Sequence, residues 1–120
     1  MIREEVISVD KVRKGKITKE YNKLKRLYAE LPENKLKLVT PVIQNAAFMK
    51  VTLEDLQYEI NEEGYTDDYR NGNEQSGRKA SAKLQAYTSL MKQYTVVIDR
   101  LQKMLPEQKT KGKLEAFLDG

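Results

Sequence analysis

Two stretches of the sequence carry residues that could do chemistry. The first runs from Gly72 to Ser81 and holds two glycines five residues apart, followed by Arg78 and Lys79. A phosphate-binding P-loop has the same glycine spacing, but it places lysine directly after the second glycine and then serine or threonine. Because Arg78 and Lys79 occupy those two positions, the string predicts a loop whose glycines supply turns and whose cations lead into a helix, and it does not predict a nucleotide site.

The second stretch is acidic and lies between Glu54 and Glu63, where Asp55 and Glu59 stand one helical turn apart. That spacing suits a divalent cation or an acid–base pair. The sequence contains no histidine and no cysteine, so the commonest metal ligand and general base are missing, as is a thiolate. Solvation of an acidic helix explains the carboxylates better. We therefore predict no catalytic activity, no metal site and no cofactor; a small metal-dependent enzyme that uses Asp55 and Glu59 is an alternative.

Basic residues gather close to the N-terminus. Between Lys11 and Arg26 eight basic residues stand against a single acid, Glu20. Lysines that recur around a helix suit contact with a phosphate backbone better than recognition of bases. An ordinary solvated helix face is the competing interpretation of the same charges. The residues predicted to bind DNA are Lys11, Arg13, Lys14, Lys16, Lys19 and Lys23, with Arg78 and Lys79 as further candidates.

Apolar residues at steps of three and four predict the helices that position these groups. A first stripe runs from Ile17 to Leu31 and ends at Pro32, and a second series runs over residues 33–61. Pro41 lies inside the second series, where it lacks an amide hydrogen and crowds the preceding turn. A long, kinked middle helix is therefore expected, and a restart with Thr40 as the cap is the favoured form of the interruption.

The third predicted helix begins at Ala80 and has the most regular pattern. Its apolar residues follow alternating steps of four and three as far as Leu105, just before Pro106, which is a heptad-like spacing. The segment over residues 65–79 is predicted to be an ordered loop. The heptad-like face could be an intramolecular core face, a surface that pairs with a second copy, or both. The residues predicted for oligomerisation are Tyr87, Met91, Tyr94 and Ile98.

The predicted fold is all-α, with three main helices that form an oligomerising helical bundle. Residues 1–106 are expected to form a single helical domain, and residues 107–120 a flexible C-terminal tail. The tail ends in an amphipathic cluster of Leu114, Phe117 and Leu118, which we expect to bind a partner protein. No apolar run approaches the length of a signal-peptide core or a membrane span, so the sequence predicts a cytoplasmic protein with no membrane partner.

Several strings over residues 33–106 also carry a family resemblance. They are Glu33-Asn34-Lys35, the segments Ala46–Leu56 and Ile60–Gly64, then Tyr69, Asn71-Gly72, Gln75, Gly77 and Lys79, and finally Tyr87 and Met91–Tyr94. In this order and spacing they resemble the small terminase subunit of tailed bacteriophages of Gram-positive hosts. The string of tyrosine, Asn-Gly, glutamine, glycine and lysine that leads into a helix with spaced tyrosines is its most specific part.

The resemblance implies a non-catalytic subunit that forms a homo-oligomeric ring in the host cytoplasm. Such a subunit binds double-stranded viral DNA, recruits the large terminase subunit, and regulates the ATPase and nuclease of that subunit during viral genome packaging. The alternative is an oligomeric helical adaptor or regulatory protein that binds protein partners only. In that case the basic helix is a solvated face.

Overall fold

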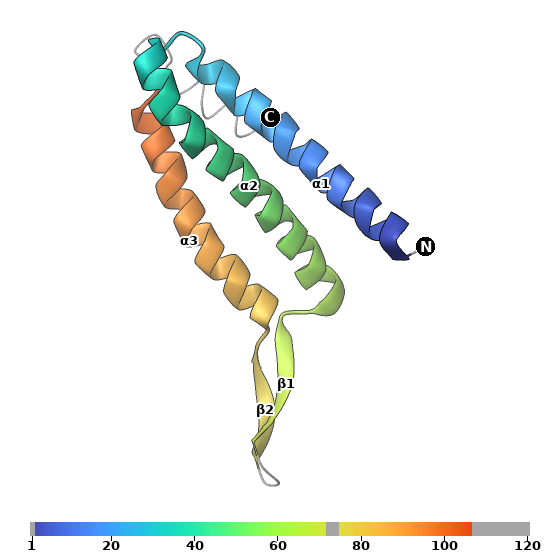
Figure 1. Ribbon diagram of the computed structural model, residues 1–120. Helices are drawn as coiled ribbons and strands as arrows, with labels where there is room; N and C mark the ends of the chain where they lie inside the picture. The colour runs from blue at the N-terminus through green and yellow to red at the C-terminus, as the bar shows by residue number, and fades with distance from the viewer. Residues whose placement is uncertain (1, 72–74, 107–120) are drawn as a thin grey trace.

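The computed structural model describes residues 2–71 and 75–106 of the chain, and it is mostly helical. Helix α1 spans Ile2–Lys25 and continues into a short 3-10 helix, η1, at Arg26–Tyr28; α2 spans Glu33–Glu63 and α3 spans Ala82–Lys103. Between α2 and α3 lies a two-stranded antiparallel hairpin of β1 (Thr66–Asn71) and β2 (Gln75–Ala80) (Figure 1). The predominance of helix confirms the predicted class.

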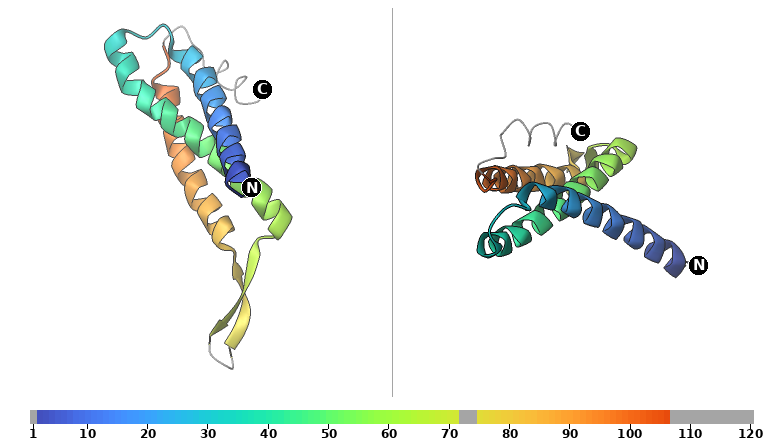
Figure 2. Two further views of the ribbon diagram at one scale, coloured as in Figure 1. Left: turned by 45° about the vertical axis from the view of Figure 1, so that its right-hand side comes forward. Right: turned by 90° about the horizontal axis from the view of Figure 1, so that it is seen from above.

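Helix α2 is the centre of the arrangement. It packs against α3 on one side and α1 on the other, and α1 diverges from α2 toward its own N-terminus (Figures 1 and 2). The hairpin extends beyond the ends of α2 and α3. The molecule is accordingly elongated, with principal extents of 63 × 36 × 26 Å. An elongated three-helix arrangement of this size leaves much of each helix outside its own core.

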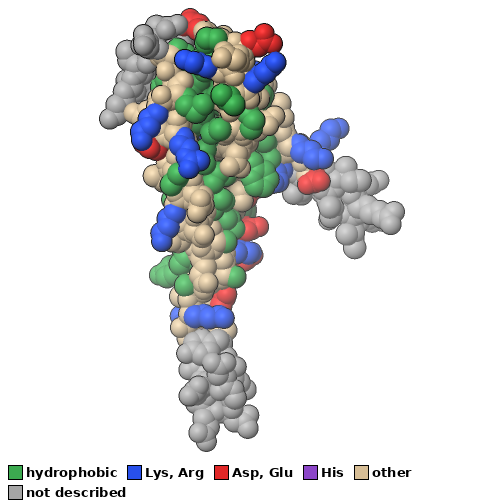
Figure 3. Space-filling model, turned by 60° about the vertical axis from the view of Figure 1, so that its left-hand side comes forward, with side chains coloured by type: hydrophobic (Ala, Val, Ile, Leu, Met, Phe, Trp, Pro, Cys, Tyr) green, Lys and Arg blue, Asp and Glu red, His purple; other side chains and the backbone are tan. Residues whose placement is uncertain are grey.

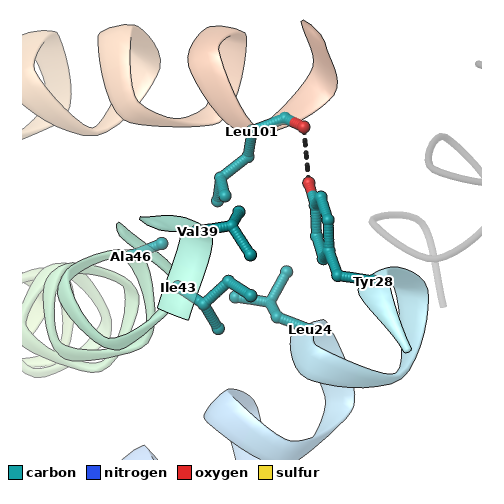
Figure 4. Packing of buried hydrophobic residues seen from close by; sticks show 6 residues of the cluster. All are labelled: Leu24, Tyr28, Val39, Ile43, Ala46 and Leu101. Carbon is teal, nitrogen blue, oxygen red and sulfur yellow. Dashed lines mark hydrogen bonds between the residues drawn. The ribbon is translucent and has the colours of Figure 1, made fainter. Parts of the chain in front are cut away.

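The core lies at the end where α1 turns into α2. Its buried side chains come from α1, η1, α2 and α3: Leu24, Tyr28, Val39, Ile43, Ala46 and Leu101 (Figure 4). The Tyr28 hydroxyl donates a hydrogen bond of 2.5 Å to the Leu101 carbonyl, so α3 is tied to the η1 turn. Leu24 and Tyr28 are four residues apart, as are Val39 and Ile43, which puts each pair on one helix face. The periodic stripes predicted for these helices are confirmed by this burial.

Helix α2 runs without interruption through Pro41, so the predicted restart at Thr40 is wrong. Thr40 is not a cap; its hydroxyl donates to the Leu36 carbonyl at 2.7 Å, within the helix. Proline in a helix interior costs about 3 kcal/mol, partly because one backbone hydrogen bond is lost. Val39 and Ile43, on either side of Pro41, are fully buried. Burial of these two side chains offsets the cost and keeps both flanks helical, whereas a kink at Pro41 stays a prediction.

The segment predicted as an ordered loop is the β-hairpin, which is a second correction. Its register pairs Thr66 with Ala80 and Asn71 with Gln75, and its base is closed by a 2.9 Å hydrogen bond from the Ser81 amide to the Tyr65 carbonyl. Asn-Gly at residues 71–72 is a recognised hairpin signal. The flanking residues are polar and lack the alternation of a half-buried strand, which is why the pattern predicted a loop.

The junctions of the hairpin with the helices are capped. Gly64 ends α2 with φ +87°, a backbone conformation that favours glycine, and its amide bonds to the Ile60 carbonyl at 2.8 Å. Helix α3 begins at Ala82, and the Ser81 hydroxyl accepts from the Leu84 amide at 3.0 Å. Ala80 therefore belongs to β2, and the predicted start of the third helix was two residues early.

Two further predictions concern the C-terminal tail and the absence of a membrane partner. The predicted tail and its cluster of Leu114, Phe117 and Leu118 lie outside the described residues. Among the helices that the structure describes, none is both long enough and apolar enough to cross a lipid bilayer.

Candidate nucleic-acid interface

From Lys11 to Leu24, the side chains of helix α1 divide into an inner and an outer face. Arg13, Ile17, Glu20 and Leu24 follow one another at steps of four, three and four, so they lie on one stripe of the helix. Ile17 and Glu20 are half-buried and Leu24 is fully buried against α2. This stripe is the inner face, and it contains one of the predicted DNA-binding residues as well as the only acid of the basic segment.

Arg13 is bound to α2. Its guanidinium forms an ion pair with Asp55, donates to the Thr52 hydroxyl at 2.5 Å, and lies 5.2 Å from the centre of the Phe48 ring. The Arg13 side chain is 27% exposed. A guanidinium with a carboxylate, a hydroxyl and an aromatic ring as partners is already satisfied within the chain. We therefore remove Arg13 from the residues proposed to contact phosphate.

Glu20 also turns toward α2. Its carboxylate pairs with Lys50 at 3.3 Å, and its side chain is only 13% exposed. Because Glu20 is the single acid between Lys11 and Arg26, no acidic side chain of that segment reaches the outer face. The basic segment is therefore more positive toward solvent than its composition indicates.

The outer face of α1, as the term is used below, consists of Lys11, Lys14, Lys16 and Lys19. All four are exposed, and at about 100° per residue they cover an arc of roughly 200° that lies opposite the inner stripe. Lys25 and Arg26 continue the positive charge toward η1. Lys23, the remaining lysine predicted to bind DNA, is half-buried and has an interaction within the chain. The structure thus leaves four of the six predicted α1 residues exposed on this arc. Lys16, at one edge of the arc, also lines the groove between α1 and α2 that contains Glu54, Asp55 and Glu59.

The two cations of the hairpin have a different setting. Arg78 pairs with Asp68 across the strands at 3.3 Å, with side chains that are 75% and 86% exposed. Lys79 is opposite Asp67 in the register of the hairpin. Such exposed pairs contribute little to stability, but they leave the base of the hairpin close to neutral. Attraction of a polyanion is therefore weaker at Arg78 and Lys79 than on the outer face of α1.

The acidic half of α2 binds cations from both neighbouring helices. Asp55 pairs with Arg13, whereas Glu59 and Glu63 both pair with Lys83 of α3, at 3.8 and 2.5 Å. The hydrogen bond to Glu63 is the main reason why the pKa of Lys83 is raised. Asp55 and Glu59, the pair considered for a metal-dependent enzyme, thus have different partners. In the part of the chain that the structure describes, no three acidic side chains converge as metal ligands would.

The residues predicted for oligomerisation are divided between core and surface. Tyr94 and Ile98 pack against the core of their own chain, and burial, followed by the charges of Glu20 and Glu54, raises the pKa of Tyr94 to about 12. Tyr87 is half-buried, and Met91 is 36% exposed. The intramolecular role of the heptad-like face is thus confirmed for Tyr94 and Ile98. A contact between copies stays a prediction.

Apolar side chains remain on the surface of the bundle. Figure 3 shows them along the face that carries α3, with basic side chains at the edges. The large exposed ones on the helices are Val12, Leu38, Phe48, Tyr58, Met91 and Val96. Exposed apolar groups on several helix faces suit contact with another protein or another copy.

Comparisons of the chain with models of protein families, with characterised proteins and with solved structures found no match.

Sequence reasoning missed the inward orientation of Arg13 and Glu20. Both residues share the three-and-four spacing of Ile17 and Leu24, and that spacing was the available signal. The partners on α2 could not be read from it, because they depend on how two helices are aligned. Only the three-dimensional structure identifies Thr52 and Asp55 as partners of Arg13, and Lys50 as the partner of Glu20.

Proposed function

We propose that this protein is a non-catalytic small terminase subunit. It assembles into a homo-oligomeric ring in the host cytoplasm, binds double-stranded viral DNA, and recruits and regulates the large terminase ATPase-nuclease for genome packaging. The resemblance of the strings over residues 33–106 is what supports the proposed family. The DNA-binding part of the proposal is supported independently, by the charges of α1.

The observation that carries the proposal is the sorting of charge on α1. Arg13 and Glu20 are directed to α2, and Lys11, Lys14, Lys16 and Lys19 are exposed on the opposite side. A rigid helix that presents lysines over a wide arc neutralises several phosphates without reading bases. Sequence-independent contact with a duplex is what this surface can provide.

Oligomerisation is proposed from the shape and the apolar surface of the protomer. The chain is elongated, and Met91 and Val96 of α3 are 36% and 48% exposed. Closed symmetric assembly is the common way in which small helical proteins cover such surfaces. Light scattering at two protein concentrations is expected to give one discrete mass, several times the 13.9 kDa of the chain. A mass of one chain at both concentrations would exclude the ring.

Replacement of the four outer-face lysines tests DNA binding. Lys11, Lys14, Lys16 and Lys19 are all changed to Ala, and binding to a short labelled duplex is measured by fluorescence anisotropy from about 50 to 200 mM salt. Each lost phosphate contact lowers the slope of log affinity against log salt by about 0.9, so the slope should fall by roughly 3 to 4.

A matched control carries four other exposed lysines replaced with Ala: Lys35, Lys37, Lys92 and Lys103. The loss of net charge is the same in both variants, but the control leaves the outer face of α1 unchanged. Equal loss of affinity in the two variants would show that total charge, and not this surface, holds the DNA. Circular dichroism of both variants verifies that the helices are retained.

The second candidate is an oligomeric adaptor that binds protein partners only. Exposed apolar side chains favour it: Val12 on α1 and Tyr58 on α2 are 57% and 67% exposed and line one groove of about 620 Å³ between these helices. In this case the unmodified protein should show no salt-dependent affinity for DNA. That result in the anisotropy measurement would select the adaptor over the terminase subunit.

A further inference from the structure

Gly15 lies near the centre of the outer face of α1. At about 100° per residue it falls in the middle of the arc that Lys11, Lys14, Lys16 and Lys19 cover. It is exposed, and it is ten residues from the end of an α-helix that spans Ile2–Lys25. The position is thus well inside a regular helix and open to solvent.

Nothing in the described part of the chain requires glycine at this position. A Cβ atom added to Gly15 would meet no heavy atom within 4 Å, so no neighbouring element approaches closely. The only described glycine with positive φ is Gly64, so Gly15 has a backbone conformation that any residue adopts. Glycine is nonetheless among the worst residues for a helix interior, second only to proline. The described contacts of the protomer therefore do not account for a glycine at this position.

The neighbours of Gly15 indicate what approaches it. Lys11 is four residues before it and Lys19 four residues after it, so one exposed lysine lies a helical turn to either side, about 6 Å away along the axis. Between them the helix surface lacks a side chain. A gap with a flexible cation on each side suits a compact anionic group that comes close to the helix backbone while both ammonium groups reach it.

We propose that Gly15 is the point at which a phosphodiester group of the DNA backbone lies directly against α1, held by Lys11 and Lys19. This inference rests on the proposed DNA-binding function and specifies where the helix touches the duplex. The missing side chain shortens the distance between the phosphate and both lysines, and a shorter distance strengthens each charge interaction. A side chain at residue 15 would hold the phosphate away from the helix and weaken both contacts together.

The test is a substitution that should affect stability and DNA binding in opposite directions. In Gly15→Ala, the better helix propensity of alanine should raise Tm by about 3 to 6 °C. The affinity for a short duplex, measured by fluorescence anisotropy, should fall by about threefold, and in Gly15→Leu by about tenfold or more. Because Gly15→Ala is expected to fold better than the parent protein, loss of binding cannot be attributed to unfolding.

The control is Ser89→Ala, at an exposed position of α3 that also gains helix propensity. It should raise Tm slightly and leave DNA affinity unchanged. Unchanged or tighter binding of DNA by Gly15→Leu would overturn the inference. If the fourfold lysine variant loses DNA but both Gly15 variants bind as the parent does, the proposed function stands and this inference fails. If the parent protein does not bind DNA, both fail.

Discussion

The two ends of α1 are held in different ways. Toward η1, Leu24 and Tyr28 are enclosed by side chains of α2 and α3, and the Tyr28 hydroxyl bonds to α3 itself. Toward the N-terminus, the described contacts with α2 centre on the polar interactions of Arg13 with Asp55 and Thr52. One continuous helix thus passes from an apolar core to a partly exposed ion pair.

Along α1, the end toward η1 thus stabilises the fold, and the part toward the N-terminus presents the lysines proposed to bind DNA. Apolar burial among three segments is cooperative and supports the whole fold. The Arg13 contact fixes only the position of α1 on α2, and it leaves the outer lysines free to meet solvent. Substitutions at the two ends of α1 should therefore differ in how much stability they cost and in how much of the molecule they affect.

The largest effect is expected from the apolar end. Ile43→Ala removes a fully buried side chain from the centre of the core and should lower the free energy of unfolding by about 2 to 5 kcal/mol. Leu38→Ala is the matched control, since Leu38 is 70% exposed on the same helix, and it should change stability by no more than about 0.5 kcal/mol. Urea unfolding measures both. Similar losses for the two variants would mean that Ile43 is not in a dry core.

The second largest effect is expected at high pH, where ionisation of Tyr28 should destabilise the same apolar end of α1. Burial raises the pKa of Tyr28 to about 12, above its usual value of 10. A raised pKa favours the protonated phenol in the folded state, so the stability from this group is complete below pH 10 and is lost as the pH rises from 10 to 12. Two pKa units correspond to at most about 2.7 kcal/mol.

Thermal unfolding followed by circular dichroism between pH 9 and about 12 tests this expectation. Tyr28→Phe has no phenol to ionise and should lose less stability over that interval than the parent protein. Tyr94, with its pKa also raised to about 12, contributes in both proteins and therefore cancels in the comparison. Parallel curves for the parent and Tyr28→Phe would show that Tyr28 is accessible to solvent.

The smallest effect is expected at the polar end. Arg13→Ala removes a partly exposed ion pair and should cost about 1 kcal/mol or less of global stability. Its main result should be local, because amide hydrogens in the first half of α1 lose their anchor and exchange faster. Hydrogen exchange should show no change around Ile43 and Leu101. Lys14→Ala, one residue along on the outer face, should leave the exchange pattern of the parent protein intact.

The sequence predicts the helices well where burial and periodicity agree. Leu24, Val39 and Ile43 are buried as their spacing indicates. The predicted restart of the helix at Thr40 is wrong, because the rule that proline interrupts a helix is local. It takes no account of the burial of Val39 and Ile43 on either side of Pro41. The hairpin was missed because its strands are polar and are supported by their junctions with α2 and α3, which a local pattern does not contain.

The candidate interface was predictable in part. The gathering of lysines near the N-terminus is visible in the sequence, and four of them share the outer face. Composition alone could not show that Arg13 and Glu20 face inward, since each is charged and lies among exposed residues. Their orientation depends on partners about 30 to 42 positions further along the chain, and such pairs are decided by helix alignment and not by local preference.

The hydrogen bond between Tyr28 and Leu101 joins residues that are synthesised at different times. Leu101 follows the last residue of α2, Glu63, by 38 positions, which at about 5 to 20 residues per second takes roughly 2 to 8 s of translation. Throughout that interval Leu24, Val39 and Ile43 lack their cover from α3. The core of the nascent chain thus stays incomplete for seconds after α2 has been synthesised, and completion of the fold waits for the third helix.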